Sequence, residues 1–359
     1  MRARRISPAE LGRHTPQDLA GAVLLGGVRL PDRSLPKGTR LTPGDARDFL
    51  RAAADDRLVE AVRLAWPDAG DLHEDEASER LALAAGGAGV EPRAPRQSRL
   101  DLAAKWAGVL HVRASALARV NAIDPLEVFT LFHGQAVTAG RVVASVKVAP
   151  HLVPEEAVRR GVRIAREEGP LVEVRPYLGL EVGAVAAERL GARELARFDT
   201  SARSKVEALG SRFVGTTAVG DGDPERAERG ALAALEDLVL RRGLRVVLVG
   251  GVSAGDPIAP FFAALERGGG EVLRRGVPAH PGSMIWLARL RECRLLGLPS
   301  CGMFAMATAA DLVLPRLLTG EALDAAALAD LGHGGLLGRE MRFRFPPYAR
   351  ELETPEVEG

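Results

Sequence analysis

Cysteine is scarce in this chain of 359 residues. Its 2 cysteines, Cys293 and Cys301, are too few for a disulfide scaffold or a four-cysteine zinc site and are typical of a reducing compartment. Aromatic residues make up only 4%, and the longest apolar runs fall well short of the ~18 residues that a membrane span needs. No apolar segment follows the basic residues after Met1. We therefore expect no signal peptide, no membrane partner and a cytoplasmic location.

An excess of charge of either sign is also lacking. The chain has 48 basic and 47 acidic side chains and a net charge of +1, which argues against nucleic acid as a partner. Hydrophobic residues make up 47%, which is enough for sizeable cores. At roughly 100–200 residues per domain, the length suits two or three domains.

The pattern of apolar and turn residues predicts four regions. Residues 1–19 are basic and show no clear periodicity, which predicts a flexible terminus. Residues 20–170 form a strand-rich α+β region, which could consist of two subdomains joined near 91–98. Residues 171–322 form an α/β domain, and residues 323–359 form a C-terminal arm.

Strands and helices alternate in the region 171–322. The run Leu244–Val249 is apolar and β-branched, as buried parallel strands are, and Asp223 with Pro224 starts a long helix. This alternation predicts a parallel sheet that is covered by helices on both faces. Ligands of such sheets bind beyond the carboxyl ends of the strands.

The first of three loops that could bind a ligand there begins at Gly250 and reads Gly-Gly-Val-Ser-Ala-Gly-Asp. Adjacent glycines let a ligand approach the backbone and point N–H groups at an anion. Ser253 could donate to a phosphate oxygen, and Asp256 could hold Mg²⁺ or a ligand hydroxyl. In the alternative interpretation the glycines only make the turn and Asp256 caps the next helix.

The other two loops begin at Pro278 and Gly297. In the second loop, His280 could contact an anion or transfer a proton, or it could be a structural hydrogen-bonding residue. In the third loop, Ser300 and the nearby backbone amides form a corner suited to an anion. Cys301 at a helix start would favour the thiolate form that a reactive cysteine needs, although no histidine or acid stands beside it in the sequence.

The order and spacing of these loops resemble the molybdopterin-binding domain. That domain is shared by molybdenum-cofactor biosynthesis proteins of the Mog and MoaB type and by the molybdopterin molybdotransferases. The resemblance covers about residues 175–320 and rests on Gly250–Asp256, Gly269-Gly-Glu-Val with Gly276-Val, Pro281-Gly, and Gly297-Leu-Pro before a helix. It implies a three-layer α/β fold that binds the phosphate of the pterin at the strand ends.

The resemblance also implies which positions bind the cofactor, which would be molybdopterin or the finished molybdenum cofactor. They are Gly250, Gly251, Val252, Ser253, Gly255 and Asp256 in the first loop, His280, Pro281, Gly282 and Ser283 in the second, and Gly297, Leu298, Pro299, Ser300, Cys301 and Gly302 in the third. Asp256 is the candidate catalytic residue and the candidate Mg²⁺ ligand.

Several positions depart from the molybdotransferase pattern. Ser283 stands in place of a lysine, Ile258 in place of an acid, and Ala186-Ala-Glu-Arg-Leu in place of a Thr-Gly-Asp-Glu loop, while Gly297-Leu-Pro continues as Ser-Cys-Gly instead of Gly-Asn-Pro. A missing cation and missing acids make binding better supported than catalysis. Arg203 and Lys205, expected near a helix start, could replace the lysine.

The region before this domain resembles the corresponding region of stand-alone molybdopterin-binding proteins. The similar segments are Lys37-Gly-Thr-Arg-Leu-Thr, Asp71–Ala77, Asn121-Ala-Ile-Asp and Val143–Val148. His73 and the acids after it could collect a metal, or they could simply be partners of a helix dipole.

We therefore expect a protein that binds molybdopterin or the molybdenum cofactor in cofactor biosynthesis, insertion or handling. One alternative is a divergent Mg²⁺-dependent molybdotransferase or adenylyltransferase, and another is an interaction scaffold without the ligand. The resemblance implies a homo-oligomer, either a dimer or a trimer, and a molybdoenzyme or cofactor-synthesis protein as partner.

Overall fold

The computed structural model describes residues 1–58, 60–95, 99–304 and 307–350. The chain divides into two compact units. Unit 1 comprises Met1–Lys105, Val112–Leu131 and Ala139–Glu173, and unit 2 comprises Trp106–His111, Phe132–Thr138 and the chain from Val174 onward. Two short segments from the first half of the chain therefore belong to unit 2.

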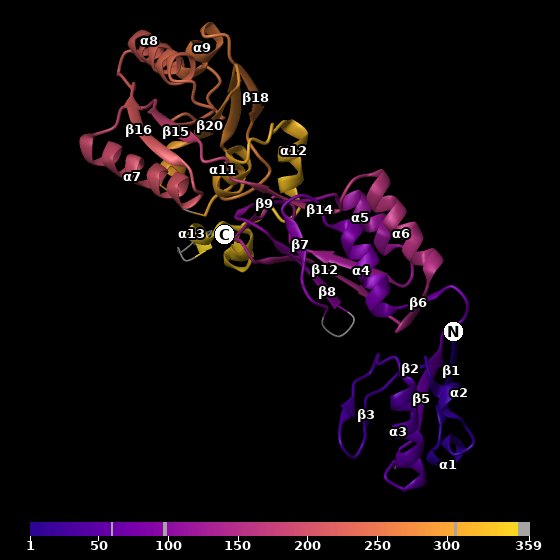
Figure 1. The fold of residues 1–359 in the computed structure, drawn as a ribbon. Coiled ribbons are helices and arrows are strands. Elements are labelled where there is room, and N and C mark those ends of the chain that lie inside the picture. Colours follow the sequence, from indigo (N-terminus) through magenta and orange to yellow (C-terminus); the bar gives the residue numbers. More distant parts are fainter. Residues whose placement is uncertain (59, 96–98, 305–306, 351–359) are drawn as a thin grey trace. The chain divides into compact units, whose positions relative to one another are not determined.

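Unit 1 is built from short strands and helices (Figure 1). Its strands are β1 (Arg2–Ile6), β2 (Val23–Leu24), β3 (Val28–Arg29), β4 (Ser34–Leu35), β5 (Val62–Trp66), β6 (Asp71–His73), β7 (Val90–Pro92), β8 (Arg99–Ala104), β10 (Leu126–Thr130), β12 (Val142–Val148) and β13 (Leu152–Pro154). Its helices are α1 (Pro8–Leu11), α2 (Pro16–Leu19), α3 (Pro43–Ala54), α4 (Glu74–Ala85), α5 (Ala114–Asn121) and α6 (Glu155–Glu167). The sheets, of order β1-β5-β2, β10-β12-β8-β7, β13-β6 and β3-β4, are antiparallel.

Residues 1–19 are ordered elements here and not the flexible terminus that the sequence suggested. β1 pairs antiparallel with β5, and α1 and α2 each begin with a capping box, on Ser7 and Thr15. In β1 only the side chain of Ile6 is buried. Because β1 buries one side chain and is held by backbone pairing, its sequence shows no alternation of apolar and polar residues, which is the signal that predicts a strand.

Unit 2 contains a six-stranded sheet of order β16-β15-β17-β20-β19-β18. Its strands are β15 (Glu181–Ala186), β16 (Arg212–Ala218), β17 (Val246–Gly250), β18 (Glu271–Arg275), β19 (Trp286–Leu290) and β20 (Cys293–Leu298). β9 (Gly108–Val112), β11 (Ala136–Val137) and β14 (Val172–Pro176) form a smaller sheet. The helices are α7 (Ala192–Ala208), α8 (Pro224–Leu235), the π-helical η1 (Glu236–Arg241), α9 (Pro260–Arg267), α10 (Ser300–Phe304), α11 (Ala310–Leu318), α12 (Ala325–Ala329), the 3₁₀ turns η2 (Asp330–Gly332) and η3 (Arg339–Arg344), and α13 (Pro347–Arg350).

The large sheet is mixed, so the prediction of a parallel sheet holds only in part. β16, β15, β17 and β20 are parallel, whereas β19 and β18 are antiparallel to their neighbours. Only Arg291 and Glu292 lie between β19 and β20, and Arg291 has a φ of 51°. A two-residue turn joins antiparallel strands, because a parallel connection needs about a dozen residues.

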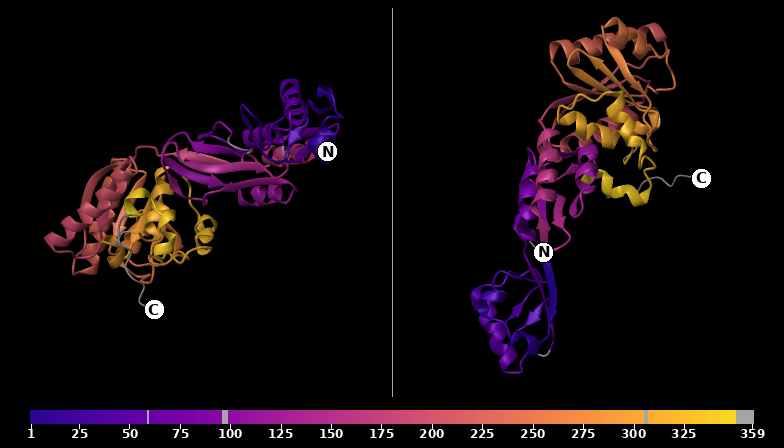
Figure 2. Two further views of the ribbon diagram at one scale, coloured as in Figure 1. Left: turned by 90° about the horizontal axis from the view of Figure 1, so that it is seen from below. Right: turned by 90° about the vertical axis from the view of Figure 1, so that its right-hand side faces the viewer.

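Helices pack on both faces of this sheet (Figure 1), and Figure 2 shows the same unit from two further sides. Side chains alternate along β17. Val246 and Leu248 pack with residues of α7 and α11, whereas Val247 and Val249 pack with residues of α8 and α9. A strand buried on both faces explains why its sequence is continuously apolar.

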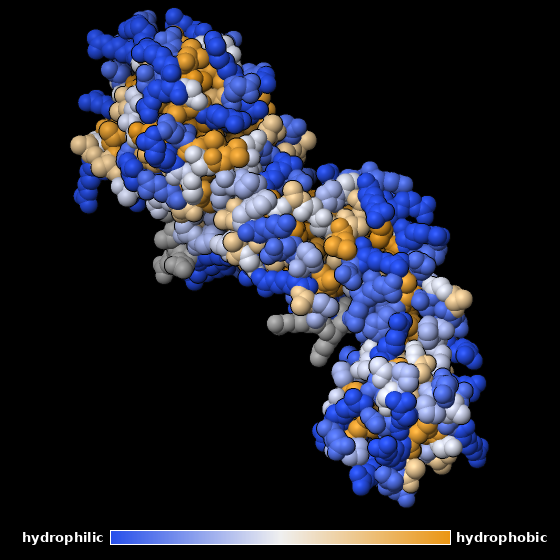
Figure 3. Space-filling view, in the orientation of Figure 1, coloured by the Kyte–Doolittle hydropathy of each residue, from blue (hydrophilic) through white to orange (hydrophobic). Residues whose placement is uncertain are grey.

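Hydrophilic side chains cover most of the face that Figure 3 shows, with smaller hydrophobic groups between them. Among the described residues no helix combines the length and the apolar character needed to cross a bilayer.

A buried polar cluster of unit 2 surrounds His111 on β9. Its Nε2 lies 3.7 Å from Glu321 Oε2, and its ring meets the His133 ring edge-on at a centroid distance of 5.3 Å. The Arg316 guanidinium donates to both Glu321 oxygens at 2.9 and 2.6 Å. Burial lowers the pKa of His111 to about 4, so the ring is neutral in the folded protein.

The depressed pKa predicts that unit 2 loses stability in acid. The unfolded histidine takes up its proton near pH 6.5, whereas the folded one takes it up only near pH 4. Stability is therefore complete above about pH 6.5 and falls by roughly 3 kcal/mol as the pH drops to about 4. Urea denaturation over this pH range should show the fall, and His111→Gln should flatten it. An unchanged slope in the variant would contradict this assignment.

Candidate functional site: the carboxyl edge of the large sheet

Two of the three predicted loops lie side by side at the carboxyl ends of parallel strands. β15, β17 and β20 end at Ala186, Gly250 and Leu298. Beyond the strand ends, the Ala187 N–H donates to the Gly250 carbonyl and the Gly251 N–H to the Leu298 carbonyl, each at 2.9 Å. These bonds hold the segments after Gly250 and Leu298 next to each other. We call this end of the sheet the carboxyl edge.

The loop that begins at Pro278 reaches the same edge from the antiparallel part of the sheet. It connects β18 to β19, and β19 begins opposite the end of β20, with Trp286 facing Gly297. The Ala254 N–H donates to the Met284 carbonyl at 3.1 Å, and the Trp286 indole N–H donates to the Val252 carbonyl at 2.9 Å. The three loops singled out in the sequence therefore meet.

Packing accounts for two of the glycines at this edge. A Cβ at Gly250 would lie 2.8 Å from the Phe198 ring and closer still to Met303, and one at Gly297 would overlap the Trp286 indole. Contacts this close need a residue without a side chain. Gly250 and Gly297 thus serve the packing of the sheet.

At Gly251 the backbone conformation itself favours glycine. Its φ is 86°, in the left-handed region that favours glycine. A Cβ here would lie 2.7 Å from Cβ of Glu188. The backbone at Gly251 therefore lies directly against the Glu188 side chain.

The loop after Gly251 holds its own shape. Ser253 Oγ accepts from the Gly255 N–H at 3.2 Å, and the Ser253 carbonyl accepts from the Asp256 N–H at 3.2 Å. Within the described part of the chain, the N–H groups of Val252 and Ser253 have no hydrogen-bond acceptor. Two fixed, unpaired donors at a strand end are what an anion would use.

Asp256 does not cap a helix. Its Oδ1 accepts from the Ile258 N–H at 3.2 Å, whereas α9 begins at Pro260 after Ala259. The alternative interpretation of Asp256 as a helix cap is therefore wrong. The carboxylate is exposed and forms a small turn. Among the residues with described positions, no three His, Cys, Asp or Glu side chains group as a metal site.

The backbone of the loop from Pro278 is tied down at several points. The His280 N–H donates to the Gly335 carbonyl, and its own carbonyl accepts from the Leu337 N–H, both at 2.7 Å. The Pro281 carbonyl accepts from the Ala309 N–H at 2.9 Å. Gly282 packs against Ala309, and the Ser283 carbonyl accepts from the Val277 N–H.

The loop from Gly297 contributes a hydroxyl to the edge. Ser300 Oγ donates to Glu188 Oε2 at 2.7 Å. The Pro299 carbonyl accepts from the Met303 N–H inside α10, which also contains Gly302. The side chain of Cys301 lies outside the described residues, so the hypothesis of a reactive thiol stays a prediction.

Glu188 is the residue of this site that the sequence analysis missed. Its side chain lies between the two neighbouring loops, in contact with Gly251 on one side and Ser300 on the other. Its position in the sequence could have indicated this role. Glu188 follows the end of β15 by two residues, as Val252 follows the end of β17. A side chain that follows a parallel strand this closely is expected at the carboxyl edge.

The idea that Arg203 and Lys205 replace the missing lysine is wrong. α7 begins at Ala192, so both residues lie inside the helix, and Arg203 pairs along it with Asp199 and Glu207. Lys205 is buried and its Nζ lies 2.6 Å from Asp311 Oδ1.

Lys205 instead belongs to a buried network around Asp311. This carboxylate also accepts from the Tyr348 hydroxyl at 2.9 Å and from the Thr308 N–H at 2.9 Å. Burial and the Asp311 charge raise the pKa of Tyr348, which keeps it a hydrogen-bond donor. The network ties α7 and α11 to the C-terminal segment of unit 2.

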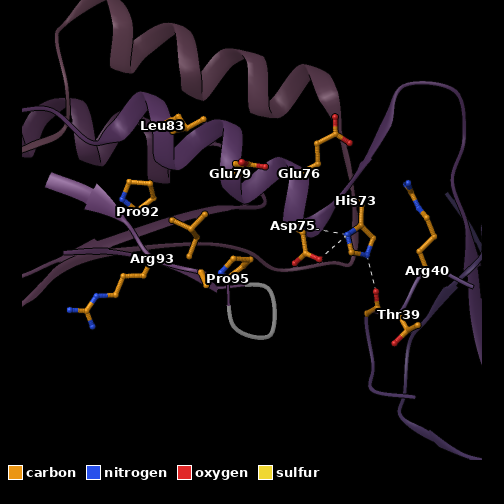
Figure 4. A pocket seen from close by; sticks show the side chains of 13 residues that line it. Thr39, Arg40, His73, Asp75, Glu76, Glu79, Leu83, Pro92, Arg93 and Pro95 are labelled. Carbon is orange, nitrogen blue, oxygen red and sulfur yellow. Dashed lines mark hydrogen bonds and ion pairs between the residues drawn. The ribbon is translucent and has the colours of Figure 1, made fainter. Parts of the chain in front are cut away.

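Unit 1 contains a separate cavity of about 680 Å³ (Figure 4). His73 lies in its wall, where Nε2 donates to the Gly38 carbonyl at 2.8 Å and Nδ1 accepts from the Asp75 N–H at 3.3 Å. Glu76 pairs with Arg80 at 2.7 Å. The similar segments at Lys37 and Asp71 thus meet at this cavity, where His73 caps α4.

No family model and no curated protein matches the chain. Among solved structures it is similar to a molybdopterin biosynthesis MoeA protein from Pyrococcus horikosii, with 14% identity, 69% of this chain and 80% of that chain covered, and a TM-score of 0.28. It is also similar to a deletion mutant of NadC, with 14% identity, 46% and 69% covered, and a TM-score of 0.16. Likeness at these scores establishes no common function.

The buried pair predicts a large cost for Lys205→Met. Removing one partner leaves Asp311 as an uncompensated buried charge, which should lower the free energy of unfolding by about 3–5 kcal/mol. Arg203→Met on the exposed face of the same helix should cost about 1 kcal/mol or less. Urea denaturation of both variants measures the difference. An equal loss of unfolding free energy in both variants would show that the buried pair of Lys205 and Asp311 stabilises the fold no more than the exposed pairs of Arg203 do.

Proposed function

We propose that unit 2 binds molybdopterin or the finished molybdenum cofactor at the carboxyl edge and acts in cofactor biosynthesis, insertion or handling. The three-layer molybdopterin-binding fold that the loop sequences resemble is part of this proposal. Its support is that the three resembling loops, distant in sequence, come together at one end of the sheet.

The observation that carries the proposal is the pair of unpaired N–H groups at Val252 and Ser253. The turn formed by Ser253 Oγ and the Gly255 N–H holds this backbone in place before any ligand arrives. Donors that need no reorganisation bind an anion more strongly than mobile ones. A phosphate monoester is an anion suited to two adjacent amides.

Exposed apolar side chains in the loops from Gly250 and Pro278 favour a ligand that also has a ring. Ile258 is 88% exposed and Met284 is 45% exposed. Met284 lies over Gly255, where a Cβ would be 2.8 Å from its methyl carbon. A flexible thioether adapts to the face of a flat heterocycle. Amides for a phosphate and apolar groups for a ring match the chemistry of a phosphorylated pterin.

The partners that the sequence suggested stay part of the proposal. We expect a homo-oligomer, a dimer or trimer, and transfer of the cofactor to or from a molybdoenzyme or a cofactor-synthesis protein. Light scattering of the purified chain measures the oligomeric state directly.

A matched pair of variants at Ser253 tests the anion site. Asp can accept from the Gly255 N–H as Ser253 does, so Ser253→Asp keeps the turn and adds a negative charge next to the donors. It should weaken molybdopterin binding about tenfold or more, because like charges repel at this distance. Ser253→Asn keeps the turn without the charge and should bind nearly as the unmodified chain does. Calorimetric titration gives both affinities.

Two results of that titration would contradict the proposal. One is the absence of molybdopterin binding to the unmodified chain, which would favour an interaction scaffold. The other is equal binding by the Asp and Asn variants, which would place the ligand elsewhere.

A second candidate function is Mg²⁺-dependent transfer chemistry, which is favoured by the carboxylates of Glu188 and Asp256 at the carboxyl edge. Mg²⁺ is commonly held by one or two carboxylates together with substrate phosphates. This function predicts Mg²⁺-dependent nucleotide turnover that Asp256→Asn abolishes, although the variant keeps the acceptor for the Ile258 N–H. Turnover that persists in the variant would rule out a role for Asp256.

A further inference from the structure

A negatively charged side chain lies against Gly251, the residue directly before the two N–H donors to which the proposed function assigns a phosphate. The Glu188 carboxylate accepts a hydrogen bond from Ser300 Oγ at 2.7 Å. Its aliphatic part lies against Gly251, so close that a Cβ there would be 2.7–2.8 Å from the Cβ and Cδ atoms of Glu188. Glu188 therefore bridges the loop after β17 and the loop after β20.

The backbone of Glu188 is held firmly in place. The carbonyl of Ala186 accepts from the N–H groups of Val219 and Gly220 at 2.9 and 3.2 Å. A Cβ at Gly220 would overlap the main chain of Glu188. This packing leaves rotation of the side chain as the way for Glu188 to move away from Gly251.

The Glu188 side chain is free to make that rotation. The side chain is only partly buried, and among the residues whose side chains are described Ser300 is its one hydrogen-bond partner. A hydrogen bond at the surface is replaced by water at little cost. The hydrogen bond of Glu188 therefore contributes little to the stability of the fold, so stability does not explain why this side chain lies against Gly251.

We infer that Glu188 is a tethered anion that occupies the phosphate position of the free protein and swings out when the ligand binds. This inference rests on the function proposed above and adds a regulatory residue to it. With Glu188 between Gly251 and Ser300, an incoming phosphate is opposed both by the charge and by the volume of this side chain. Only an anion whose affinity for the amides is high enough to displace the carboxylate can therefore bind, and weakly binding anions are excluded.

Two substitutions at Glu188 separate charge from volume. Glu188→Gln keeps the length of the side chain and an acceptor for Ser300 but removes the charge. Glu188→Ala removes both. We expect affinity for molybdopterin, and for inorganic phosphate as the minimal anion, to rise about tenfold in Glu188→Gln and at least as much in Glu188→Ala.

The matched control is Glu181→Gln, the same change in charge at the opposite end of β15. Glu181 is exposed and pairs with Arg212 at the amino end of the sheet. This variant should bind both probes as the unmodified chain does. The advantage of Glu188→Gln should also shrink as salt is added, because screening weakens the repulsion that the substitution removes.

Calorimetric titration of the full chain and these variants, with Ser253→Asp alongside, decides the matter. Tighter binding in Glu188→Gln and Glu188→Ala but not in Glu181→Gln, with the salt dependence described, supports the inference. Equal binding by Glu188→Gln and Glu181→Gln, with Ser253→Asp still impaired, overturns the inference but leaves the proposed function standing. Loss of binding in Glu188→Gln also overturns it, because Glu188 would then hold the ligand. No binding by any variant means that the proposed function fails and the inference with it.

Discussion

The parallel pairing of β15, β17 and β20 is the constraint on which the rest of unit 2 depends. Because these strands run in the same direction, the segments that follow them leave the sheet at one end. The bonds from Ala187 to Gly250 and from Gly251 to Leu298 continue the ladder past the strand ends. They bring the loops after β17 and β20 together, with Glu188 in contact with Gly251 of one loop and Ser300 of the other, so the site is a product of strand order.

Local signals in the sequence predicted the elements of unit 2 well. The apolar run at Leu244 corresponds to β17, and Asp223 caps α8 by accepting from the Arg226 N–H at 3.0 Å. Such signals work because both features depend on residues close in sequence. β1 left no such signal, since it is held by pairing with β5, about sixty residues away. The strand at β19 could be predicted from its apolar run, but its antiparallel direction could not, because the turn at Arg291 lacks a glycine.

For the candidate site, too, local sequence predicted the loops but not the contacts between them. The loops at Gly250, Pro278 and Gly297 could be recognised from composition, and the structure places them together. Their internal contacts could not be foreseen, because they depend on which strands are neighbours. Gly297 proved to pack on Trp286, and Lys205 proved to pair with Asp311 inside the core. The role of Glu188 could not be predicted either, because its place between the two loops depends on the order of the strands in the sheet.

The proposed function depends on binding of the phosphate by backbone amides of the loop after β17. The most direct measurement is the amide ¹H–¹⁵N spectrum of the labelled full chain during titration with molybdopterin. We predict that the signals of Val252 and Ser253 move downfield together and saturate with the ligand, while those on β1 and α3 stay in place. Saturation of binding without movement of these two signals would contradict the account.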